Sequence, residues 1–289
     1  MNNTDFENGF SNSTHTSNTL NTEEQSSCSE SNCLQSPFPD GKPDSGLTSI
    51  DDDNVLYIVI PAYNEEENVL NVINDWYPVV EKHNGGGLSR LVIINDGSKD
   101  STYDIVLKET ESRPYLTAIT KENSGHGGTV LYGYNYAIEH NADYIFQTDS
   151  DGQTLPSEFE AFWDKRDMYD MVIGWRNTRQ DGFSRVFVTK ILKLVIKLCF
   201  KVTVKDANTP FRLMKADTLE KYIDMIPENF NLSNVMVSVI YTKNNLHVKY
   251  IPITFRPRQG GVNSINMKKI FKIGKKAVSD FRTLNKSLK

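Results

Sequence analysis

The sequence predicts an α/β fold with a mixed, mainly parallel sheet flanked by helices. Two observations predict it. From residue 55 onward, short apolar runs of strand length alternate with longer segments of helical length. The first four of these runs each end in polar or glycine-rich residues. This alternation is typical of right-handed strand–helix–strand units, whose strands are parallel and lie side by side.

The first part of the domain is expected to alternate strands and helices. The strands are predicted over 55–61, 91–96, 115–120 and 144–146. The helices are predicted from Glu65 to about Lys82, after the turn 97–102, and from the segment 123–128 to about Asn141. Residues 62–64 are expected to form a turn. Acidic side chains at 65–67 suit the positive end of a helix, which favours a start there.

The second part continues with less regular spacing. The expected elements are a helix from Pro156 to about Tyr169, a strand over 171–175, a helix from Ser184 to Lys201, a turn and short strand over 206–214, mainly helical residues over 216–243 and a strand over 247–255. A loop over 256–265 and a basic helix close the chain. We therefore expect a disordered acidic tail over 1–53, one folded domain over 54–262 and a basic C-terminal helix over 263–289.

The charge of the chain is unevenly distributed. Residues 1–54 carry ten acidic side chains and one basic side chain, Lys42. Because the formal net charge of the whole chain is −5, residues 55–289 carry about +4. The tail is also rich in Asn, Ser and Thr and poor in apolar residues, a composition that cannot bury a core. The low pI therefore describes the tail and not the folded domain.

Cysteine usage and hydropathy restrict the compartment. Cys28 and Cys33 lie in the tail and Cys199 lies in an apolar run, with no spacing typical of zinc. This pattern favours a reducing compartment, and we expect a cytoplasmic protein. No secretory signal pattern and no apolar run long enough to span a bilayer is visible. No nucleic-acid recognition motif appears, and the basic residues are not interleaved with aromatic ones, so nucleic acid is not an expected partner.

A pair of carboxylates marks the expected ligand site. Asp149 and Asp151 follow the buried strand 144–146, and Gly152 allows a sharp turn after them. Ligands of open α/β sheets bind at the carboxyl ends of the strands, where the ends of neighbouring strands also bring Tyr63, Asp96 and Gly127. Carboxylate oxygens suit Mg²⁺ or Mn²⁺ held beside a diphosphate. The sequence therefore predicts a nucleotide and metal site at this edge.

Three motifs occur in order along the chain: Pro61-Ala62-Tyr63-Asn64-Glu65, Asn95-Asp96-Gly97-Ser98 and Asp149-Ser150-Asp151-Gly152-Gln153. They resemble those of the family 2 glycosyltransferases, whose fold is called GT-A. The segment 206–212 resembles the acceptor-side motif of the polyprenyl-phosphate sugar transferases, the dolichol-phosphate mannose synthase branch. The segment 256–264 resembles a basic, glycine-containing loop near the end of that domain.

The resemblance implies roles on the donor side. Residues expected to hold the nucleobase and ribose are Pro61, Ala62, Tyr63 and Glu65. Asp96 would hydrogen-bond the base. Asp149 would contact the ribose or the metal, and Asp151 would ligate the metal on the diphosphate. The donor is then a UDP- or GDP-sugar, and the base and the sugar stay open.

The resemblance also implies roles around the transferred sugar and the acceptor. Gly152 and Gln153 would line the sugar pocket, and Arg212 would face the acceptor or the diphosphate. Arg256 and Arg258 would close over the phosphates. His126 lies in a glycine-rich helix start that can bind phosphate through backbone N–H groups, or serve as a local hydrogen bonder. No catalytic role is assigned to it.

The expected reaction is a single-step displacement at the anomeric carbon with inversion, in which the metal on Asp151 neutralises the charge of the leaving diphosphate. A hydroxyl acceptor requires a general base, for which Asp206 is the first candidate and Asp181 the second. Members of the wider family often carry Glu at the position matching Asn234. A phosphate acceptor needs no base, so this departure favours a polyprenyl phosphate, with Arg185 and Arg212 as phosphate contacts.

Two alternatives remain open. One is a transferase that adds the sugar to a hydroxyl group of a glycan under assembly. The other is a non-catalytic nucleotide-sugar-binding protein, which intact Asp149 and Asp151 disfavour.

The helix over Ser184–Lys201 carries Lys190, Lys193, Lys197 and Lys201 at spacings of three and four, which places them on one stripe. Such a helix can lie on the inner face of a membrane, or it can pack on the core with a solvated lysine face. The basic C-terminal helix, with lysines at 268, 269, 272, 275 and 276, would add electrostatic attraction to anionic lipids.

Overall fold

A computed structural model describes residues 53–176, 183–228, 230–257, 281 and 285. The strands are β1 (Leu56–Ala62), β2 (Arg90–Asn95), β3 (Leu116–Thr120), β4 (Tyr144–Gln147), β5 (Met171–Arg176), β6 (Arg212–Lys215) and β7 (Val248–Ile253). The helices are α1 (Val69–Lys82), α2 (Thr102–Thr110), α3 (Gly125–Glu139), α4 (Glu160–Trp163), α5 (Phe183–Phe200), α6 (Ala216–Ile223) and α7 (Ser233–Lys243), with 3₁₀ turns η1 (Gly85–Gly87) and η2 (Pro156–Glu158).

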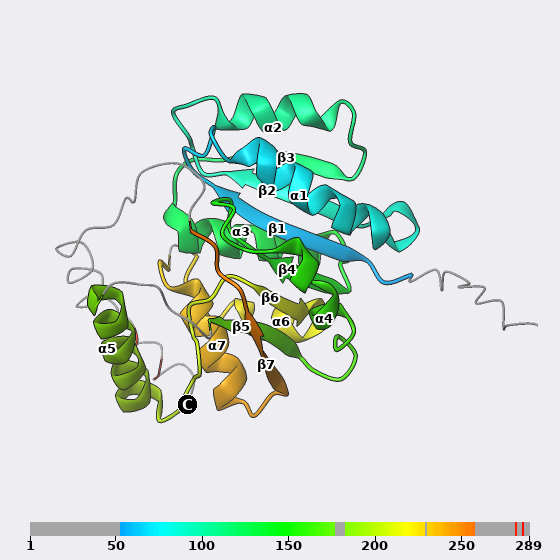
Figure 1. The fold of residues 1–289 in the computed structure, drawn as a ribbon. Coiled ribbons are helices and arrows are strands. Elements are labelled where there is room, and N and C mark those ends of the chain that lie inside the picture. The colour runs from blue at the N-terminus through cyan, green and yellow to red at the C-terminus, as the bar shows by residue number, and fades with distance from the viewer. Residues whose placement is uncertain (1–52, 177–182, 229, 258–280, 282–284, 286–289) are drawn as a thin grey trace, which may run out of the picture. The chain divides into compact units, whose positions relative to one another are not determined.

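The strands form one mixed sheet in the order β3-β2-β1-β4-β6-β5-β7 (Figure 1). The first four strands by sequence pair in parallel, with β1 between β2 and β4. Strand β6 runs antiparallel to both of its neighbours, whereas β7 pairs in parallel with β5. The prediction of a mixed, mainly parallel sheet is confirmed. The carboxyl ends of β1, β2 and β4 consequently lie next to one another.

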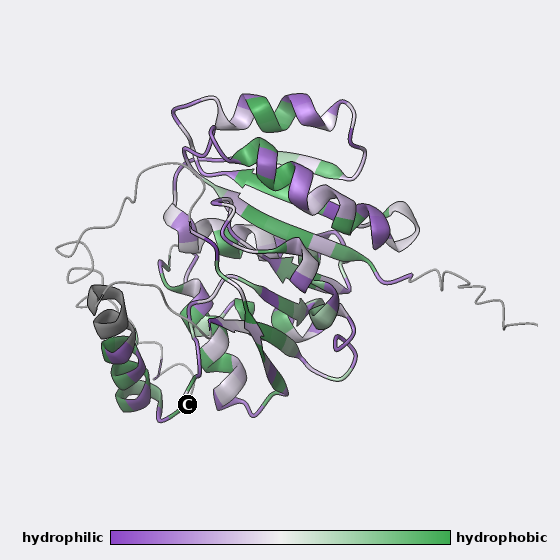
Figure 2. Ribbon diagram, viewed as in Figure 1, coloured by the Kyte–Doolittle hydropathy of each residue, from purple (hydrophilic) through white to green (hydrophobic). Residues whose placement is uncertain are grey.

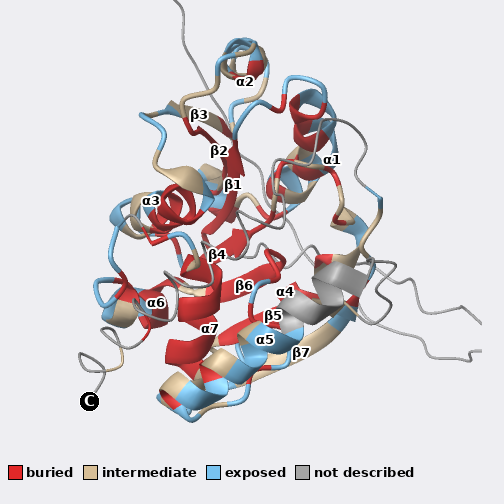
Figure 3. Ribbon diagram, turned by 90° about the vertical axis from the view of Figure 1, so that its left-hand side faces the viewer, coloured by how far each residue is buried: buried red, intermediate tan, exposed pale blue. Residues whose placement is uncertain are grey.

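Helices cover both faces of the sheet. Figure 3 shows α1 and α4 on one side and α3, α6 and α7 on the other. All seven residues of β1 are buried, because both of its faces are covered. A continuous apolar run is the usual sequence of such a central parallel strand. Figure 2 shows the same distribution, with hydrophobic strands inside and hydrophilic residues on the outer helical surfaces.

Each face of the sheet has its own core. On the α1 side, Trp76 packs against Phe146 and Phe211, with ring centroids 5.1 and 5.9 Å apart. On the α3 side, Tyr134 and Tyr241 are fully buried. Because the two cores pack against opposite faces of the central strands, the loops that follow β1, β2 and β4 start from well-packed strand ends.

Several predicted boundaries were wrong. The acidic run 65–67 forms a turn, and α1 begins only at Val69. Ala62 is part of β1 and not of a turn. The helix expected from Pro156 to Tyr169 is broken into η2 and the short α4. At this turn the backbone N–H groups of Glu65 and Glu66 donate to Thr102 Oγ1 and Asp100 Oδ2, side chains that lie at and just before the start of α2.

Some predictions lie outside the described residues. These are the structure of the acidic tail over 1–52, the loop over 258–265 and most of the basic segment over 263–289. Within that last segment Phe281 is described. Its ring is buried against Phe200 and Phe230, with centroids 5.3 and 6.0 Å apart.

Candidate nucleotide-sugar site

The predicted donor residues meet at one edge of the sheet. In the register of β1 and β2, Ala62 lies opposite Asn95, and the backbone N–H of Asp96 donates to the carbonyl of Ala62 at 2.9 Å. Asp149 follows β4, the other neighbour of β1, by two residues. The ends of three adjacent strands therefore carry Tyr63, Asp96 and the Asp149–Asp151 pair.

The loops after β1 and β2 are held together by side chain to backbone hydrogen bonds. The N–H of Asn64 donates to Ser98 Oγ at 2.9 Å, and the N–H of Lys99 donates to Asn64 Oδ1 at 2.9 Å. The N–H of Glu65 donates to Thr102 Oγ1 at 2.8 Å. Asn64 has a φ of 53°, a left-handed conformation that Asn tolerates better than most residues. This interlocking makes the two loops one platform.

The four residues expected around the base differ in exposure. Pro61 and Ala62 are buried in β1, whereas Tyr63 is 44% exposed. The side chain of Glu65 is buried, and its Oε2 accepts a hydrogen bond from Asn68 Nδ2 at 2.7 Å. Of these residues, Tyr63 has a side chain that a ligand could contact, whereas the buried side chain of Glu65 supports the loop through its hydrogen bond with Asn68.

Asp96 is buried and joins β2 to the start of α3. Its Oδ1 accepts hydrogen bonds from Lys121 Nζ at 2.6 Å and from the N–H of Ser124 at 2.8 Å. Its Oδ2 accepts from the N–H of Gly125 at 2.9 Å. A carboxylate at a helix N-terminus is stabilised by unpaired backbone donors and by the helix dipole. Asp96 thus caps α3 in this structure, a role that the sequence analysis did not assign to it.

Asp149 is partly exposed and is contacted from α3. Nε2 of His126, in the first turn of that helix, lies 2.9 Å from Asp149 Oδ1. Desolvation by neighbouring atoms would lower the pKa of this half-exposed imidazole, but the carboxylates of Asp149, Asp151 and Asp96 outweigh it and raise the pKa above its ordinary value. The carboxylates at this edge therefore favour the protonated, cationic form of the His126 imidazole.

A tight turn follows the two carboxylates. Gly152 has a φ of 67°, which favours glycine, and the N–H of Gln153 donates to Asp151 Oδ1 at 3.2 Å. Gln153 Nε2 donates to the carbonyl of Arg256 at 2.9 Å, and the N–H of Arg256 donates back to the carbonyl of Gln153 at 2.8 Å. In this structure Gln153 therefore joins the turn to the segment after β7.

The guanidinium of Arg256 contacts the carbonyl of Thr154 at 3.1 Å and Asp75 Oδ2 at 3.4 Å. In this structure it links the turn that carries Asp151 to α1, and its expected closing over the phosphates stays a prediction. Arg258 lies outside the described residues, as does the side chain of Arg185.

The donor set fits a divalent cation that a diphosphate also ligates. Asp149 and Asp151 supply hard oxygen atoms at the strand end, the ligand type that Mg²⁺ and Mn²⁺ prefer. In the described parts of the chain, no group of three or more His, Cys, Asp or Glu side chains is arranged to hold a metal. Such a cation is usually bound by one or two carboxylates, with substrate phosphates and water completing the shell.

Asp206, a candidate base, is buried and ion-paired. Arg176, the last residue of β5, places Nε 3.2 Å from Asp206 Oδ2, and its own guanidinium lies 5.2 Å from the centre of the Phe255 ring. Next to this pair, Lys205 Nζ lies 3.5 Å from the centre of the Trp175 ring. Because Arg176 already engages the Asp206 carboxylate, this geometry disfavours Asp206 as a general base.

Arg212 is also bonded within the protein. Its side chain is fully buried, and it donates to the carbonyl oxygens of Thr209 at 2.6 Å, Asn234 at 2.9 Å and Ala207 at 3.4 Å. In this structure the guanidinium donates its hydrogen bonds to backbone carbonyl oxygens. Arg212 thereby ties the loop before β6 to the first turn of α7. The expectation that Arg212 faces the acceptor or the diphosphate stays a prediction.

Two site residues were missed by sequence reasoning. Lys121 holds Asp96, and Arg176 holds Asp206. Each lies at or just after the end of a strand, which was the available signal, but neither belongs to a recognised motif. Asn234, which was singled out, is buried at the start of α7, and its Oδ1 has no hydrogen-bond partner among the described residues.

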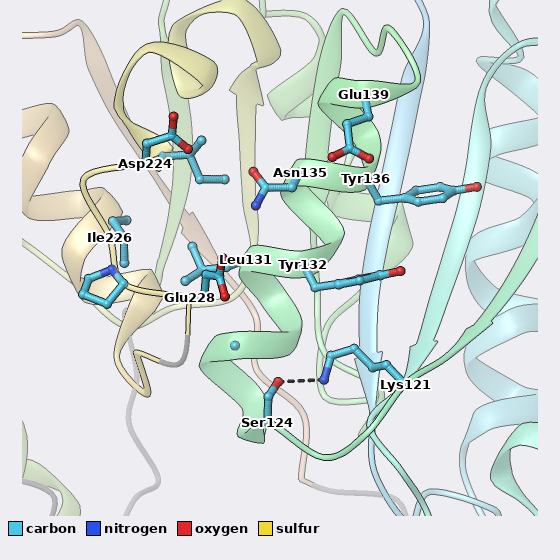
Figure 4. Close-up of a pocket in the computed structure, with 13 residues that line it drawn as sticks. Lys121, Ser124, Leu131, Tyr132, Asn135, Tyr136, Glu139, Asp224, Ile226 and Glu228 are labelled. Carbon is cyan, nitrogen blue, oxygen red and sulfur yellow. Dashed lines mark hydrogen bonds between the residues drawn. The ribbon is translucent and has the colours of Figure 1, made fainter.

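A cavity of about 570 Å³ lies beside the site, along the outer surface of α3 (Figure 4). Lys121 and Ser124 line one end of it, and Nζ of Lys121 donates to Ser124 Oγ at 2.6 Å. The far wall comes from the segment 223–228. Neither Tyr63 nor the Asp149–Asp151 pair lines this cavity, so it is separate from the strand-end site.

Fold and site together define an α/β protein with paired carboxylates at the carboxyl edge of its sheet, the edge at which such folds bind ligands. The family model described as "Glycosyl transferase family 2" matches residues 57–223. The chain belongs to this family and is a glycosyltransferase.

Relatives of known activity agree with this assignment. The chain is 28% identical over 222 residues to a UDP-N-acetylglucosamine–dolichyl-phosphate N-acetylglucosaminyltransferase of Methanococcus voltae, covering 70% of this chain and 85% of the relative. It is 23% identical over 219 residues to a polyprenol monophosphomannose synthase of Mycolicibacterium smegmatis, covering 72% and 80%. These names place both relatives among the polyprenyl-phosphate sugar transferases.

A solved structure confirms the fold. Glucosyl-3-phosphoglycerate synthase from Mycobacterium tuberculosis, in complex with Mn²⁺, UDP-glucose and glycerol 3-phosphate, aligns with a TM-score of 0.58 at 14% identity and covers 80% of each chain. At this identity the likeness concerns the fold alone, and it confirms the GT-A expectation.

Proposed function

We propose that this enzyme transfers a sugar from a nucleoside diphosphate sugar to a polyprenyl phosphate, with inversion at the anomeric carbon. The observation that carries the proposal is the meeting of Tyr63 with Asp149 and Asp151 at one sheet edge. Support for the acceptor comes from the relatives named for dolichyl-phosphate and polyprenol substrates.

Asp151, with Asp149, would hold a divalent cation, Mg²⁺ or Mn²⁺, on the diphosphate. When bound, such a cation supplies positive charge that stabilises the leaving group. The chain's own contribution is orientation, since the turn at Gly152 and the bonds from Gln153 hold Asp151 in place. Tyr63, whose side chain is 44% exposed, offers an aromatic surface to the nucleobase.

A phosphate acceptor fits the surroundings of the candidate bases. Asp206 is paired with Arg176, and an amide replaces a carboxylate at Asn234. Deprotonating a hydroxyl acceptor needs a positioned base, whereas a phosphate monoester is already anionic at neutral pH. The absence of a well-placed base among these two residues therefore supports a phosphate acceptor over a glycan hydroxyl.

Access to a lipid acceptor would involve α5. Figure 3 shows α5 beside α7 with a largely exposed outer surface. Exposed apolar side chains, Ile191, Leu194 and Leu198, are 42%, 56% and 72% accessible and alternate with exposed Lys190, Lys193 and Lys197. An apolar stripe bordered by lysines is typical of helices that lie in an anionic membrane surface. We place the enzyme as a peripheral protein on the cytoplasmic face of a membrane.

Across the described parts of the chain, no helix is both long enough and apolar enough to cross a bilayer.

The central experiment is a donor panel with a defined acceptor. UDP- and GDP-sugars are incubated with Mg²⁺ or Mn²⁺, with and without a short polyprenyl phosphate, and product is measured after extraction into organic solvent. We expect one donor to give an extractable product only when the polyprenyl phosphate is present. Product that remains in the aqueous phase with a glycan acceptor would favour the hydroxyl alternative. Tight donor binding without turnover would favour a binding protein.

Asp151→Asn tests the metal assignment in the same assay. Loss of this ligand is expected to lower turnover by about 100-fold or more, as for other groups that stabilise leaving-group charge. Asp217→Asn is the matched control, because Asp217 is 72% exposed and follows β6, which ends at the opposite edge of the sheet. Its turnover should equal that of the wild type, and retained turnover in Asp151→Asn would remove Asp151 from the reaction.

A further inference from the structure

The segment Gly125-His126-Gly127-Gly128 forms the first turn of α3 and has so far no role in the reaction. His126 is 51% exposed at its side chain, so it is not part of the core. Its neighbours in sequence are glycines, which are unfavourable in a helix. The reason why glycine occupies these positions therefore helps to explain the role of the histidine between them.

Two of the glycines are required by their surroundings. Gly125 has a φ of +80°, a left-handed conformation that glycine adopts without strain. A Cβ atom on Gly127 would lie 2.1 Å from the carbonyl oxygen of Phe230 and 2.8 Å from the Cα of Asn231. Side chains at these positions would push α3 away from the segment before α7. The glycines thus set where the first turn of α3 lies.

The same turn is fixed from the other side by Asp96. The carboxylate accepts hydrogen bonds from the N–H groups of Ser124 and Gly125, and Lys121 balances its charge at 2.6 Å. The start of α3 is therefore held between the end of β2 and the segment before α7. His126 projects from a backbone whose position is determined by contacts on both sides.

The side chain that this turn presents meets the metal-site carboxylate. His126 Nε2 lies 2.9 Å from Asp149 Oδ1, a normal distance for a charge-assisted hydrogen bond. Asp149 follows β4, 23 residues along the chain from His126. The contact is thus a tertiary one, made possible by the fixed start of α3.

From this geometry we propose that His126 is a positioning residue for the donor site: it donates a hydrogen bond to Asp149 and holds that carboxylate in the orientation in which it serves the cation and the nucleotide. This inference rests on the proposed function. Partners that orient the ligands of a metal typically change its affinity by 10- to 100-fold when they are removed. Removal of the His126 side chain is expected to weaken metal affinity by a factor in this range, although the side chain does not contact the transferred sugar.

The test measures Mn²⁺ binding directly and does not depend on turnover. Free Mn²⁺ is followed by electron paramagnetic resonance during titration of the full chain, with UDP and separately with GDP present. His126→Ala is expected to weaken Mn²⁺ binding by about 10- to 100-fold. His126→Gln keeps an N–H donor at a similar reach and should bind within about threefold of the wild type by the same reasoning.

A matched control lies at the other end of the same helix. His140 caps α3, is exposed and contacts the carbonyl of Tyr136 at 2.7 Å. His140→Ala should leave Mn²⁺ affinity unchanged. Because His126 is half exposed, thermal unfolding of His126→Ala should match that of the wild type, which separates lost positioning from lost folding.

The outcomes separate this inference from the proposed function. If Asp151→Asn abolishes Mn²⁺ binding and His126→Ala does not weaken it, positioning by His126 is overturned and the metal site stands. An equal loss in His126→Ala and His126→Gln would also overturn it, because a retained donor should rescue. If Asp151→Asn binds Mn²⁺ as the wild type does, or the wild type binds none with either nucleotide, the proposed metal site itself fails.

Discussion

The two halves of the sheet edge use their charged residues in opposite ways. After β1, β2 and β4, polar groups of one loop bind the backbone of the next, and Tyr63, Asp149 and Asp151 keep part of their surface accessible. After β5 and before β6, the charged groups interact with other groups of the protein. Asp206 pairs with Arg176, and the guanidinium of Arg212 donates its hydrogen bonds to backbone carbonyl oxygens.

The difference teaches that a charged residue in a motif does not by itself indicate a substrate contact. On the donor side, a change of an exposed residue such as Tyr63 should alter ligand binding with little effect on folding. On the other side, a change should alter folding first, because buried groups lose partners that water cannot replace. Four substitutions test this contrast, ordered here by their expected effect on the free energy of unfolding.

The largest effect is expected for Arg212→Met. The substitution leaves the carbonyl oxygens of Thr209, Asn234 and Ala207 without this donor inside the protein. Each buried polar group left unsatisfied costs about 1–3 kcal/mol, so the free energy of unfolding should fall by about 3 kcal/mol or more. Urea denaturation followed by circular dichroism measures it. An unchanged denaturation midpoint, together with lost activity, would instead support Arg212 as a substrate contact.

Arg176→Met is expected to have the second largest effect. It removes the guanidinium that lies 3.2 Å from buried Asp206, and we expect a loss of about 2 kcal/mol in unfolding free energy. Combining it with Asp206→Asn should recover part of this loss, since the uncompensated charge is then absent. If the double variant is as unstable as the sum of the single variants, the pair is not coupled.

Tyr63→Ala should affect binding and not folding. Because the side chain is 44% exposed, the free energy of unfolding should change by less than about 0.5 kcal/mol. Stacking of a base on an aromatic ring is worth about 1–3 kcal/mol, so UDP or GDP should bind roughly tenfold or more weakly. Isothermal titration calorimetry measures the affinity, and Tyr63→Phe should retain it. Unchanged affinity in Tyr63→Ala would exclude Tyr63 as the base platform.

The smallest effect on folding is expected for the combined change of Lys190, Lys193 and Lys197 to Glu. These exposed side chains should leave the unfolding free energy within about 0.5 kcal/mol. Binding to vesicles that contain anionic lipid should fall by over 100-fold, at about 1 kcal/mol for each lysine near the surface. Sedimentation with vesicles of phosphatidylcholine and phosphatidylserine measures it.

A charge-matched control for α5 uses exposed lysines elsewhere. Lys82, Lys108 and Lys221 lie on α1, α2 and α6, and changing all three to Glu alters the net charge by the same amount. If this control loses vesicle binding to the same extent, the attraction comes from net charge, and α5 has no special part in it.

The sequence by itself determined the mainly parallel sheet and the edge at which Tyr63, Asp96 and Asp151 meet. Apolar periodicity and turn residues are local signals, and the rule that parallel strands end at one edge converts them into a shared site. Helix starts were less well predicted. The N–H groups of Glu65 and Glu66, for example, donate to the side chains of Thr102 and Asp100, which only the fold brings near them.

Only the tertiary structure decided which side chains of the motifs remain accessible to a ligand. Burial depends on every element packed around a residue, and no local pattern records it. Arg212 and Tyr63 were both motif residues, yet one is enclosed by α7 and the loop before β6 while the other stands at the surface. The contact between His126 and Asp149 has the same origin, since it requires the start of α3 to be held beside the end of β4.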